Sequence, residues 1–335
     1  MQTRILGKSD LALTTIGLGT WAIGGPWIRG WGEQNDVDSI QTIQRAMDLG
    51  INWIDTAPVY GLGHAEEIVG YALDGTAIKS LISTKCGQLW DGNGHVFGSL
   101  RKKNIFAEAE RSLKRLRVDV IDLYQIHWPN PEEEIEEGWD AIARLVEAGK
   151  VRFGGVCNFT IDQMNLIRPI HPIASLQPPY SMLKRDIEKK ILPYCAEHRM
   201  GVIGYSPMQK GLLTGKVTPE WVSELPPDDH RKKDPMFLEP ELEINEYSIS
   251  QLKAVAEEHG KALSQLAVAW VLRRKEMTSA IVGARKKWQI EETAPAGEWF
   301  LSDETIDRIE IILEERKNKL SEISNPFNPK AVEWV

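Results

Sequence analysis

Four ionisable side chains of this chain stand at the ends of short apolar runs, where their chemistry could combine. Asp55, Lys85 and His127 each end such a run, and Tyr60 lies just beyond Asp55. A tyrosine can give a proton to a carbonyl oxygen, although its ordinary pKa of about 10 is high for acid-base catalysis near neutrality. A buried lysine beside it favours the phenolate and lowers that pKa, and an aspartate keeps the lysine charged. A histidine can orient the carbonyl oxygen by a hydrogen bond, so the four residues predict proton delivery to a carbonyl compound.

These side chains can meet only if the runs that carry them are neighbouring strands of one sheet. Short apolar runs alternate along the chain with stretches of helical period, such as 263–271. Such alternation is typical of βαβ units, and in a (β/α)8 barrel the polar residues at the carboxyl ends of the strands converge on one mouth. We therefore predict an α/β fold of the (β/α)8 TIM-barrel type, with an open doubly wound sheet as the alternative. The eight predicted strands are 15–19, 52–55, 81–85, 120–127, 151–157, 174–177, 201–205 and 280–283.

Three segments fall outside the eightfold pattern. Residues 1–13, with a Gly-Lys-Ser-Asp turn, predict an N-terminal β-hairpin that closes the bottom of the barrel. Residues 302–315 predict an extra C-terminal helix with Ser302 as its N-cap. Residues 209–246 are rich in proline and charge and predict a long functional loop. Because no Pro-, Gly- or Ser-rich linker divides the chain, residues 1–335 are expected to form a single domain.

Composition and charge narrow the class of protein. The 335 residues carry 40 Lys and Arg against 48 Asp and Glu, a formal net charge of −8 with a pI near 5.5. This acidic balance argues against a nucleic-acid partner. No apolar run approaches the roughly 20 residues that span a bilayer, and no export signal opens the chain, so we expect no membrane partner and a cytoplasmic location. Three cysteines without a CxxC pair fit a reducing compartment.

Other motifs of known chemistry fail on their context. Residues 17–22 nominally fit the Rossmann pattern G-x-G-x-x-A, but the Gly-Gly-Pro that follows them prevents the helix that a pyrophosphate needs there. Residues 91–94 (Asp-Gly-Asn-Gly) predict a turn rather than a metal loop. No HExxH or paired-Cys spacing occurs, so no metal is expected, and a metal-dependent barrel hydrolase lacks the cluster that it needs.

At this point the ordered motifs resemble a known family. From residue 7 to about residue 313 the chain resembles the aldo-keto reductases, in the bacterial branch that includes relatives of potassium-channel beta subunits. The motifs that carry the resemblance include Asp55-Thr-Ala-x-x-Tyr60-Gly61, Thr84-Lys85, Val118-Asp-x-Ile-Asp-Leu-Tyr-x-x-His127-Trp-Pro129, Gly155-Val-x-Asn-Phe159, Gln177-Pro-Pro-Tyr180 and Val282-Gly-Ala-Arg285.

The resemblance implies a (β/α)8 barrel that binds NADP(H) without a Rossmann domain and transfers a hydride to an aldehyde or ketone. It implies that Tyr60 is the general acid, that Asp55 and Lys85 tune it, and that His127 orients the carbonyl. It implies that residues of this chain contact all three parts of the cofactor: the nicotinamide carboxamide and ring, the pyrophosphate, and the phosphate on the adenosine. These contacts are Thr20, Trp21, Asp55, Asn158, Gln177, Tyr205, Ser206, Pro207, Met208, Gly211, Lys216, Arg231, Gly283, Arg285 and Gln289.

Two positions depart from the family's pattern. Cys157 stands where the family usually has serine, and a thiol is a weaker hydrogen-bond partner for the carboxamide. Thr293 stands where the family often has an asparagine that contacts the adenine.

The charge pattern predicts a preference for NADPH over NADH. Arg285 begins a run of three cations before a predicted helix, and a guanidinium there suits a 2′-phosphate. The alternative is that these cations are solvent-facing rim charges.

Twelve tryptophans, several near the predicted mouth, suggest an apolar substrate pocket. We expect Trp21, Tyr60, His127 and Trp128 to line it, the alternative being that the tryptophans only pack under loops. The predicted function is an NADPH-dependent reductase of aldehydes or ketones, and the alternative is an NADP(H)-binding redox-sensing regulator of the same fold with slow turnover. The expected partner is a small aldehyde or ketone substrate, and the expected oligomeric state is a monomer.

Overall fold

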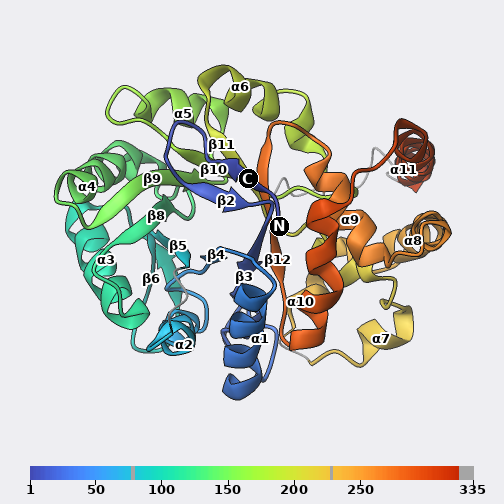
Figure 1. The fold of residues 1–335 in the computed structure, drawn as a ribbon, viewed down its shortest axis with the longest axis horizontal. Helices are drawn as coiled ribbons and strands as arrows, with labels where there is room; N and C mark the ends of the chain where they lie inside the picture. Colours follow the sequence, from blue (N-terminus) through green and yellow to red (C-terminus); the bar gives the residue numbers. More distant parts are fainter. Residues whose placement is uncertain (77–79, 227–228, 324–335) are drawn as a thin grey trace.

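Parallel strands close into a barrel at the centre of the molecule, and helices surround it (Figure 1). The computed structural model describes residues 1–76, 80–226 and 229–323. Around the barrel the strands follow the order β10-β11-β12-β3-β4-β5-β8-β9, so the predicted closed barrel is confirmed and the open sheet is wrong. The strands are β3 (Ile16–Gly19), β4 (Trp53–Asp55), β5 (Leu81–Cys86), β8 (Ile121–Ile126), β9 (Val151–Cys157), β10 (Ser175–Gln177), β11 (Gly201–Gly204) and β12 (Met277–Gly283).

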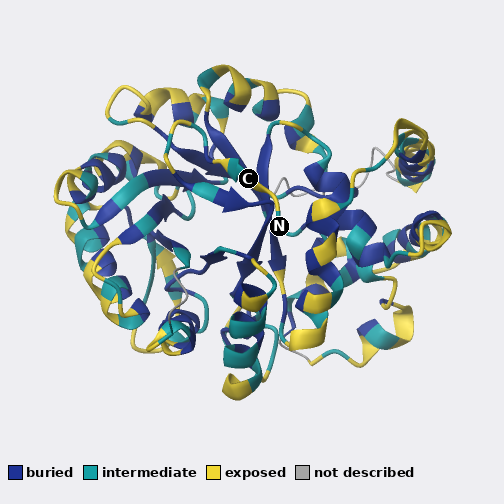
Figure 2. Cartoon of the chain, viewed as in Figure 1, coloured by how far each residue is buried: buried dark blue, intermediate teal, exposed yellow. Residues whose placement is uncertain are grey.

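The helices pack their apolar faces on the outside of these strands and present polar faces outward (Figure 2). Their ends follow local signals: the Asn35 side chain caps α1 by accepting from Asp38 N, and Gly50, Gly149 and Gly260 follow three helices with positive φ. No helix in the described ranges is long and apolar enough to cross a membrane. The helices are α1 (Asp36–Asp48), α2 (His64–Leu73), α3 (Lys102–Leu116), α4 (Ile135–Glu147), α5 (Ile161–Ile167), α6 (Ile191–His198), α7 (Pro219–Ser223), α8 (Glu241–Glu258), α9 (Leu263–Leu272), α10 (Lys287–Thr293) and α11 (Asp303–Ile323).

The bottom of the barrel is closed by apolar side chains. Strands β1 (Thr3–Ile5) and β2 (Ala12–Thr14) pair antiparallel as the predicted hairpin. Between and beside them Leu6, Leu11 and Leu13 pack on side chains inside the barrel, among them Trp53. The Trp53 ring has room only because Gly17 faces it, since a Cβ on Gly17 would lie 2.0 Å from that ring. The hairpin therefore plugs this end, and polar chemistry is left to the other end.

At the opposite end, the segments after the strands differ from the sequence prediction in two places. A short hairpin of β6 (Gln88–Trp90) and β7 (Val96–Gly98), which was not predicted, follows β5, and its turn is the predicted 91–94. Residues 209–246, predicted as one long loop, contain short helical turns and α7, and α8 already begins at Glu241. The length of that loop was therefore overestimated, because its proline- and charge-rich sequence forms short helical turns and the first turn of α8.

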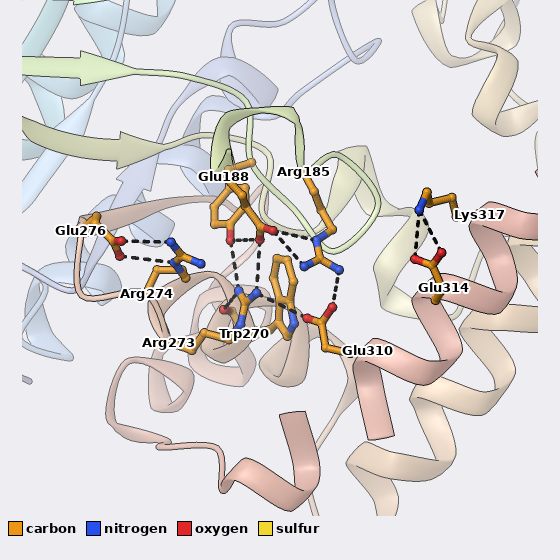
Figure 3. Close-up of polar contacts among 10 residues, drawn as sticks. Arg185, Glu188, Trp270, Arg273, Arg274, Glu276, Glu310, Glu314 and Lys317 are labelled. Atoms are coloured by element: carbon orange, nitrogen blue, oxygen red, sulfur yellow. Dashed lines mark hydrogen bonds and ion pairs between the residues drawn. The ribbon is translucent and has the colours of Figure 1, made fainter. Parts of the chain in front are cut away.

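The extra C-terminal helix is α11, which packs beside α8 (Figure 1). Ser302 caps it as predicted, because its hydroxyl accepts from Thr305 N at 3.2 Å, but the helix continues to Ile323 rather than ending near residue 315. A network of charges fastens α11 to the barrel wall (Figure 3): Glu310 pairs with Arg185 at 2.6 Å and with Arg273 at 3.5 Å. Both arginines also pair with Glu188 and contact the Trp270 ring.

Candidate active site

Asp55, Lys85 and Tyr60 meet at the mouth of the barrel, as the sequence predicts. Asp55 ends β4, Lys85 lies near the end of the adjacent β5, and Tyr60 lies in the turn before α2. Lys85 Nζ donates to Asp55 Oδ2 at 2.6 Å, to the carbonyl of Thr56 at 2.9 Å and to the Tyr60 hydroxyl at 3.3 Å. Lys85 has no exposed surface and Asp55 is 3% exposed, so this is a buried ion pair with its remaining hydrogen-bonding capacity in use.

A chain of side-chain hydrogen bonds inside the barrel holds Asp55 in place. Its Oδ1 accepts from Ser83 Oγ at 3.1 Å and from Gln177 Nε2 at 2.9 Å. Gln125 extends the chain by donating to Ser83 Oγ at 2.9 Å. Sequence reasoning missed Ser83, although alternation along β5 places it on the same face as Lys85 and could have identified it. The carboxylate therefore has one orientation, and the lysine has one position relative to Tyr60.

The protonation state of Tyr60 differs from the sequence expectation. Burial raises the pKa of Tyr60 to about 12; the charge of Lys85 lowers it, and the charge of Asp55 raises it further. The lysine acts in the predicted direction, but burial outweighs it, so the expected net lowering is wrong. Burial by itself would lower the pKa of Lys85, yet the charges of Asp55 and Tyr60 raise it above its ordinary value. Near neutral pH the pair is therefore an ammonium beside a phenol that still carries its proton.

His127 faces the same phenol from the end of β8. The two ring centroids are 5.7 Å apart and the rings are nearly perpendicular. Burial, followed by the charges of Lys85 and Arg29, lowers the pKa of His127 well below its ordinary value, so the imidazole is neutral. Its Nδ1 is buried without a hydrogen-bond partner among the described residues. A neutral imidazole with an N–H to offer beside a tyrosine hydroxyl can hold a carbonyl oxygen between them.

Aromatic rings surround this mouth, but not all of them are the predicted ones. Trp128 stacks on His127 with centroids 6.5 Å apart, and Trp27 lies 6.4 Å from Tyr60. Trp21, predicted to line the pocket, donates its indole N–H to the carbonyl of Arg29 at 2.9 Å and packs on Trp31. Trp27 is therefore a tryptophan beside Tyr60, and the place of Trp21 in the substrate pocket stays a prediction.

The residues expected at the nicotinamide end occupy the neighbouring strand ends. Asn158 Nδ2 donates to the carbonyl of His127 at 3.1 Å, and its Oδ1 accepts from the Tyr205 hydroxyl at 2.9 Å. Burial raises the pKa of Cys157 above its ordinary value, so its sulfur stays a thiol. Thr20 is buried and donates from both its amide and its hydroxyl to the carbonyl of Asp55. Gln177 Nε2 donates to Asp55 Oδ1, and among the described residues its Oε1 accepts no hydrogen bond and can accept one from a ligand.

The expected pyrophosphate loop is a chain of tight turns after β11. Ser206 has a positive φ of 55°, and Met208 accepts backbone hydrogen bonds from Gly211 N and Leu213 N, with Pro207 between them in the sequence. Downstream, Lys216 lies 4.6 Å above the Trp288 ring. These turns place a curved backbone beside the mouth.

Arg231 belongs to a cluster that sequence reasoning missed. It is 8% exposed and pairs with Asp229 through two nitrogens, at 3.0 and 2.7 Å. Its guanidinium lies over the rings of Trp31, at 4.4 Å, and Trp221, at 4.7 Å. Trp31 lies in the segment between β3 and α1, residues 20–35, so the cluster joins this first strand-to-helix segment to the segment that carries Arg231. No regular period or motif marks these positions, and no sequence signal could have joined them.

At the expected adenosine end, Arg285 is held by backbone and amide oxygens. It donates from Nε to Gln34 Oε1 at 2.7 Å, from Nη1 to the carbonyl of Trp31 at 3.0 Å, and from Nη2 to the carbonyl of Glu33. At the start of α10, Gln289 Oε1 accepts from the amides of Arg285 and Lys286, at 2.7 and 3.1 Å, so these two amides are already bonded within the chain. Gly283 ends β12 and is exposed, so the backbone is open to a ligand there.

No group of His, Cys, Asp or Glu in the part of the chain that the structure describes could hold a metal ion. The ionisable groups that meet at the mouth are a carboxylate, an ammonium, a phenol and a neutral imidazole. Two cations, Arg231 and Arg285, lie close enough at the far side for the charge of the first to lower the pKa of the second, in addition to the larger effect of burial.

The chain is similar to known proteins over nearly its whole length. Residues 15–314 match the model of the aldo/keto reductase family. The chain is 39% identical to aldo-keto reductase YhdN of Bacillus subtilis, over 98% of this chain and 97% of that one. It is 33% identical to the NADH-specific methylglyoxal reductase of Escherichia coli, over 89% and 94%. It is 31% identical to a probable voltage-gated potassium channel subunit beta of Arabidopsis thaliana, over 95% and 98%.

A solved structure shows the same likeness. The glycerol dehydrogenase AKR11B4 of Gluconobacter oxydans superposes with a TM-score of 0.87 and 41% identity, over 98% of this chain and 97% of that one. The closed barrel, the buried lysine-tyrosine pair at its mouth and these matches lead to one conclusion: the chain belongs to the aldo-keto reductase family of oxidoreductases that act on carbonyl compounds.

Proposed function

We propose that this protein is an NADPH-dependent reductase of aldehydes or ketones, with Tyr60 as the general acid. The observation that carries the proposal is the contact of the Tyr60 hydroxyl with Lys85 Nζ, at 3.3 Å, in a mouth that also holds a neutral His127. A phenol whose pKa is about 12 keeps its proton near neutrality, which is the form that reduction of a carbonyl requires.

The residues of this chain suit a nicotinamide dinucleotide at one side of the mouth. The free oxygen of Gln177 is placed to accept from a carboxamide beside Asp55. Farther out, the guanidinium of Arg285 bonds only to neutral oxygens among the described residues, so its charge remains for an anion. The chemistry that NADPH brings when bound is a hydride for the carbonyl carbon.

The side chains of this chain orient the carbonyl compound and supply its proton. His127 donates an N–H to the carbonyl oxygen and holds it near Tyr60, which gives that oxygen its proton. Lys85 stabilises the resulting phenolate, and Asp55 keeps the lysine charged inside the barrel. Trp27 and Trp128 exclude water from the reacting atoms. A proton from solvent then restores the phenol.

A panel of aliphatic and aromatic aldehydes and ketones tests the proposal, with loss of reduced-nicotinamide absorbance as the measurement and NADPH and NADH compared. We expect turnover of several aldehydes, with a preference for NADPH. Tight NADPH binding without turnover of any carbonyl would contradict the reductase and favour the alternative of a redox-sensing protein. Faster turnover with NADH than with NADPH at saturating carbonyl would contradict the proposed cofactor preference alone.

A further inference from the structure

Arg285 differs in its partners from two other arginines of the chain, Arg231 and Arg115. Arg231 pairs with Asp229, and Arg115 pairs with the buried carboxylate of Glu66. Arg285 instead donates to two backbone carbonyls and one amide oxygen, and no carboxylate in the described residues bonds to it. It is half-buried, and burial and the charge of Arg231 lower its pKa, while the carboxylate of Asp229, which is itself paired with Arg231, raises it. A desolvated cation without a counter-ion indicates a place where an anion binds.

Gln34 is the residue that keeps this cation uncompensated and in place. Its Oε1 accepts from Arg285 Nε at 2.7 Å, and its Nε2 donates back to the carbonyl of Arg285 at 3.0 Å. The same Nε2 lies 3.0 Å from Ser39 Oγ, a buried group in the first turn of α1. The Gln34 amide is therefore held against α1 by Ser39, and it hydrogen-bonds to both the side chain and the backbone of Arg285.

Two N–H groups of the Arg285 guanidinium remain available for a ligand after these contacts. A guanidinium has five N–H groups, one on Nε and two on each terminal nitrogen. The contacts with Gln34, Trp31 and Glu33 use one N–H on each of the three nitrogens. One N–H on each terminal nitrogen remains, which is the number that a phosphate takes in a two-point contact.

We propose that Gln34 is a positioning residue that determines cofactor specificity, because its uncharged amide orients Arg285 toward a 2′-phosphate without neutralising it. A carboxylate at the same position would bond to Nε equally well, but it would cancel the charge and repel the phosphate. The proposal rests on the proposed function, in which Arg285 reads that phosphate. It places the specificity of the dinucleotide partly in the first strand-to-helix segment, far in sequence from β12.

The test is a set of binding titrations with NADPH and NADH, followed by quenching of tryptophan fluorescence, on Gln34→Glu, Gln34→Leu and Arg285→Ala. For Gln34→Glu we expect NADPH binding to weaken about ten- to a hundred-fold, the range for a hydrogen bond to a charged group, with NADH changing about two-fold at most. Gln34→Leu should weaken NADPH binding several-fold, because the guanidinium keeps its charge but loses its orientation. Gln41→Glu is the matched control: it adds the same charge on α1, where no hydrogen bond among the described residues joins residue 41 to Arg285, and it should leave the ratio of the two affinities near that of the wild type.

A double variant separates this inference from the proposed function. In an Arg285→Ala background, Gln34→Glu should no longer change the NADPH to NADH ratio, because Gln34 acts through Arg285. An equal effect in both backgrounds, or a wild-type ratio in Gln34→Glu, would overturn the role of Gln34. An unchanged ratio in Arg285→Ala alone would instead overturn the assignment of Arg285 to the 2′-phosphate.

Discussion

The two sides of the barrel mouth are built differently. On the side of β4, β5 and β8, the reactive groups lie on or next to strands, and Lys85 and Asp55 are almost fully buried. On the side of β11 and β12, the charged groups lie on segments after the strands and bond to other such segments. The first side is held by the barrel itself, whereas the second is held by contacts between loops.

In the proposed function, the strand side carries out the chemistry and the loop side binds the nucleotide. A proton donor needs a fixed partner in a dry setting, and strand ends inside a barrel supply both. A dinucleotide is long and must enter and leave, so its contacts belong on segments that other segments hold from outside. Changes on the strand side are therefore expected to affect the rate, and changes on the loop side are expected to affect which nucleotide binds.

The largest effect is expected from Tyr60→Phe. Phenylalanine keeps the ring beside His127 but has no proton to give, and general acid catalysis contributes about 10²–10⁴-fold to a rate. We expect kcat for aldehyde reduction to fall by about that factor while NADPH binding stays near wild type. Single-turnover kinetics and a fluorescence titration measure the two quantities. A variant with nearly normal kcat would show that another group supplies the proton.

Lys85→Met should also lower kcat strongly. The charge of Lys85 lowers the pKa of Tyr60, so without it burial and Asp55 raise that pKa beyond about 12. Oxidation of an alcohol needs the phenolate and therefore rises with pH, and in this variant its rise should move to higher pH than in the wild type. The pH profile of alcohol oxidation measures the shift.

A control for Lys85→Met is needed because the variant leaves Asp55 buried without its counter-ion, which typically costs about 3–5 kcal/mol. Asp55→Asn combined with Lys85→Met removes both charges and should recover much of the lost thermal stability without recovering kcat. If kcat returned together with stability, Lys85 would serve only the fold, and the contrast between the two sides of the mouth would fail.

On the loop side, Arg285→Ala should weaken NADPH binding by about ten- to a hundred-fold, since hydrogen bonds to charged groups contribute about 1.5–3 kcal/mol. NADH lacks the 2′-phosphate, so its binding should change little, and kcat at saturating NADPH should stay near wild type. Titration of the wild type and of Arg285→Ala with both nucleotides measures this. Equal losses for NADPH and NADH would mean that Arg285 only holds the 31–34 segment.

The smallest expected effect is that of salt. Arg285 is partly exposed, so raising the salt from about 0.05 to about 0.5 M should reduce the NADPH over NADH preference a few-fold by screening. The Lys85–Asp55 pair is buried and screened far less, so kcat at saturating cofactor should hardly change. A kcat that fell with salt as much as the nucleotide preference would contradict the conclusion that the strand side is less exposed to screening than the loop side.

Much of the strand side could be predicted from the sequence. The alternation of apolar runs and helical stretches predicts the strands, and closure of the barrel brings Asp55, Lys85 and His127 to one end. Sequence reasoning overestimated the loop 209–246, missed the β6–β7 hairpin, and did not identify Trp27 as a neighbour of Tyr60. It also gave Tyr60 a lowered pKa, because the identity of a neighbour can be read from a motif but the depth of burial cannot.

The sequence by itself therefore determined the order of the elements and the residue types at the strand ends, since both depend on local periodicity and on barrel closure. Only the tertiary structure decided that Gln34 grips Arg285, that Trp31 lies under Arg231, and that burial keeps the proton on Tyr60. The first two contacts join segments about 200 residues or more apart in the chain, with no period that links them. The third depends on how much water the finished barrel excludes, which is a property of packing in three dimensions.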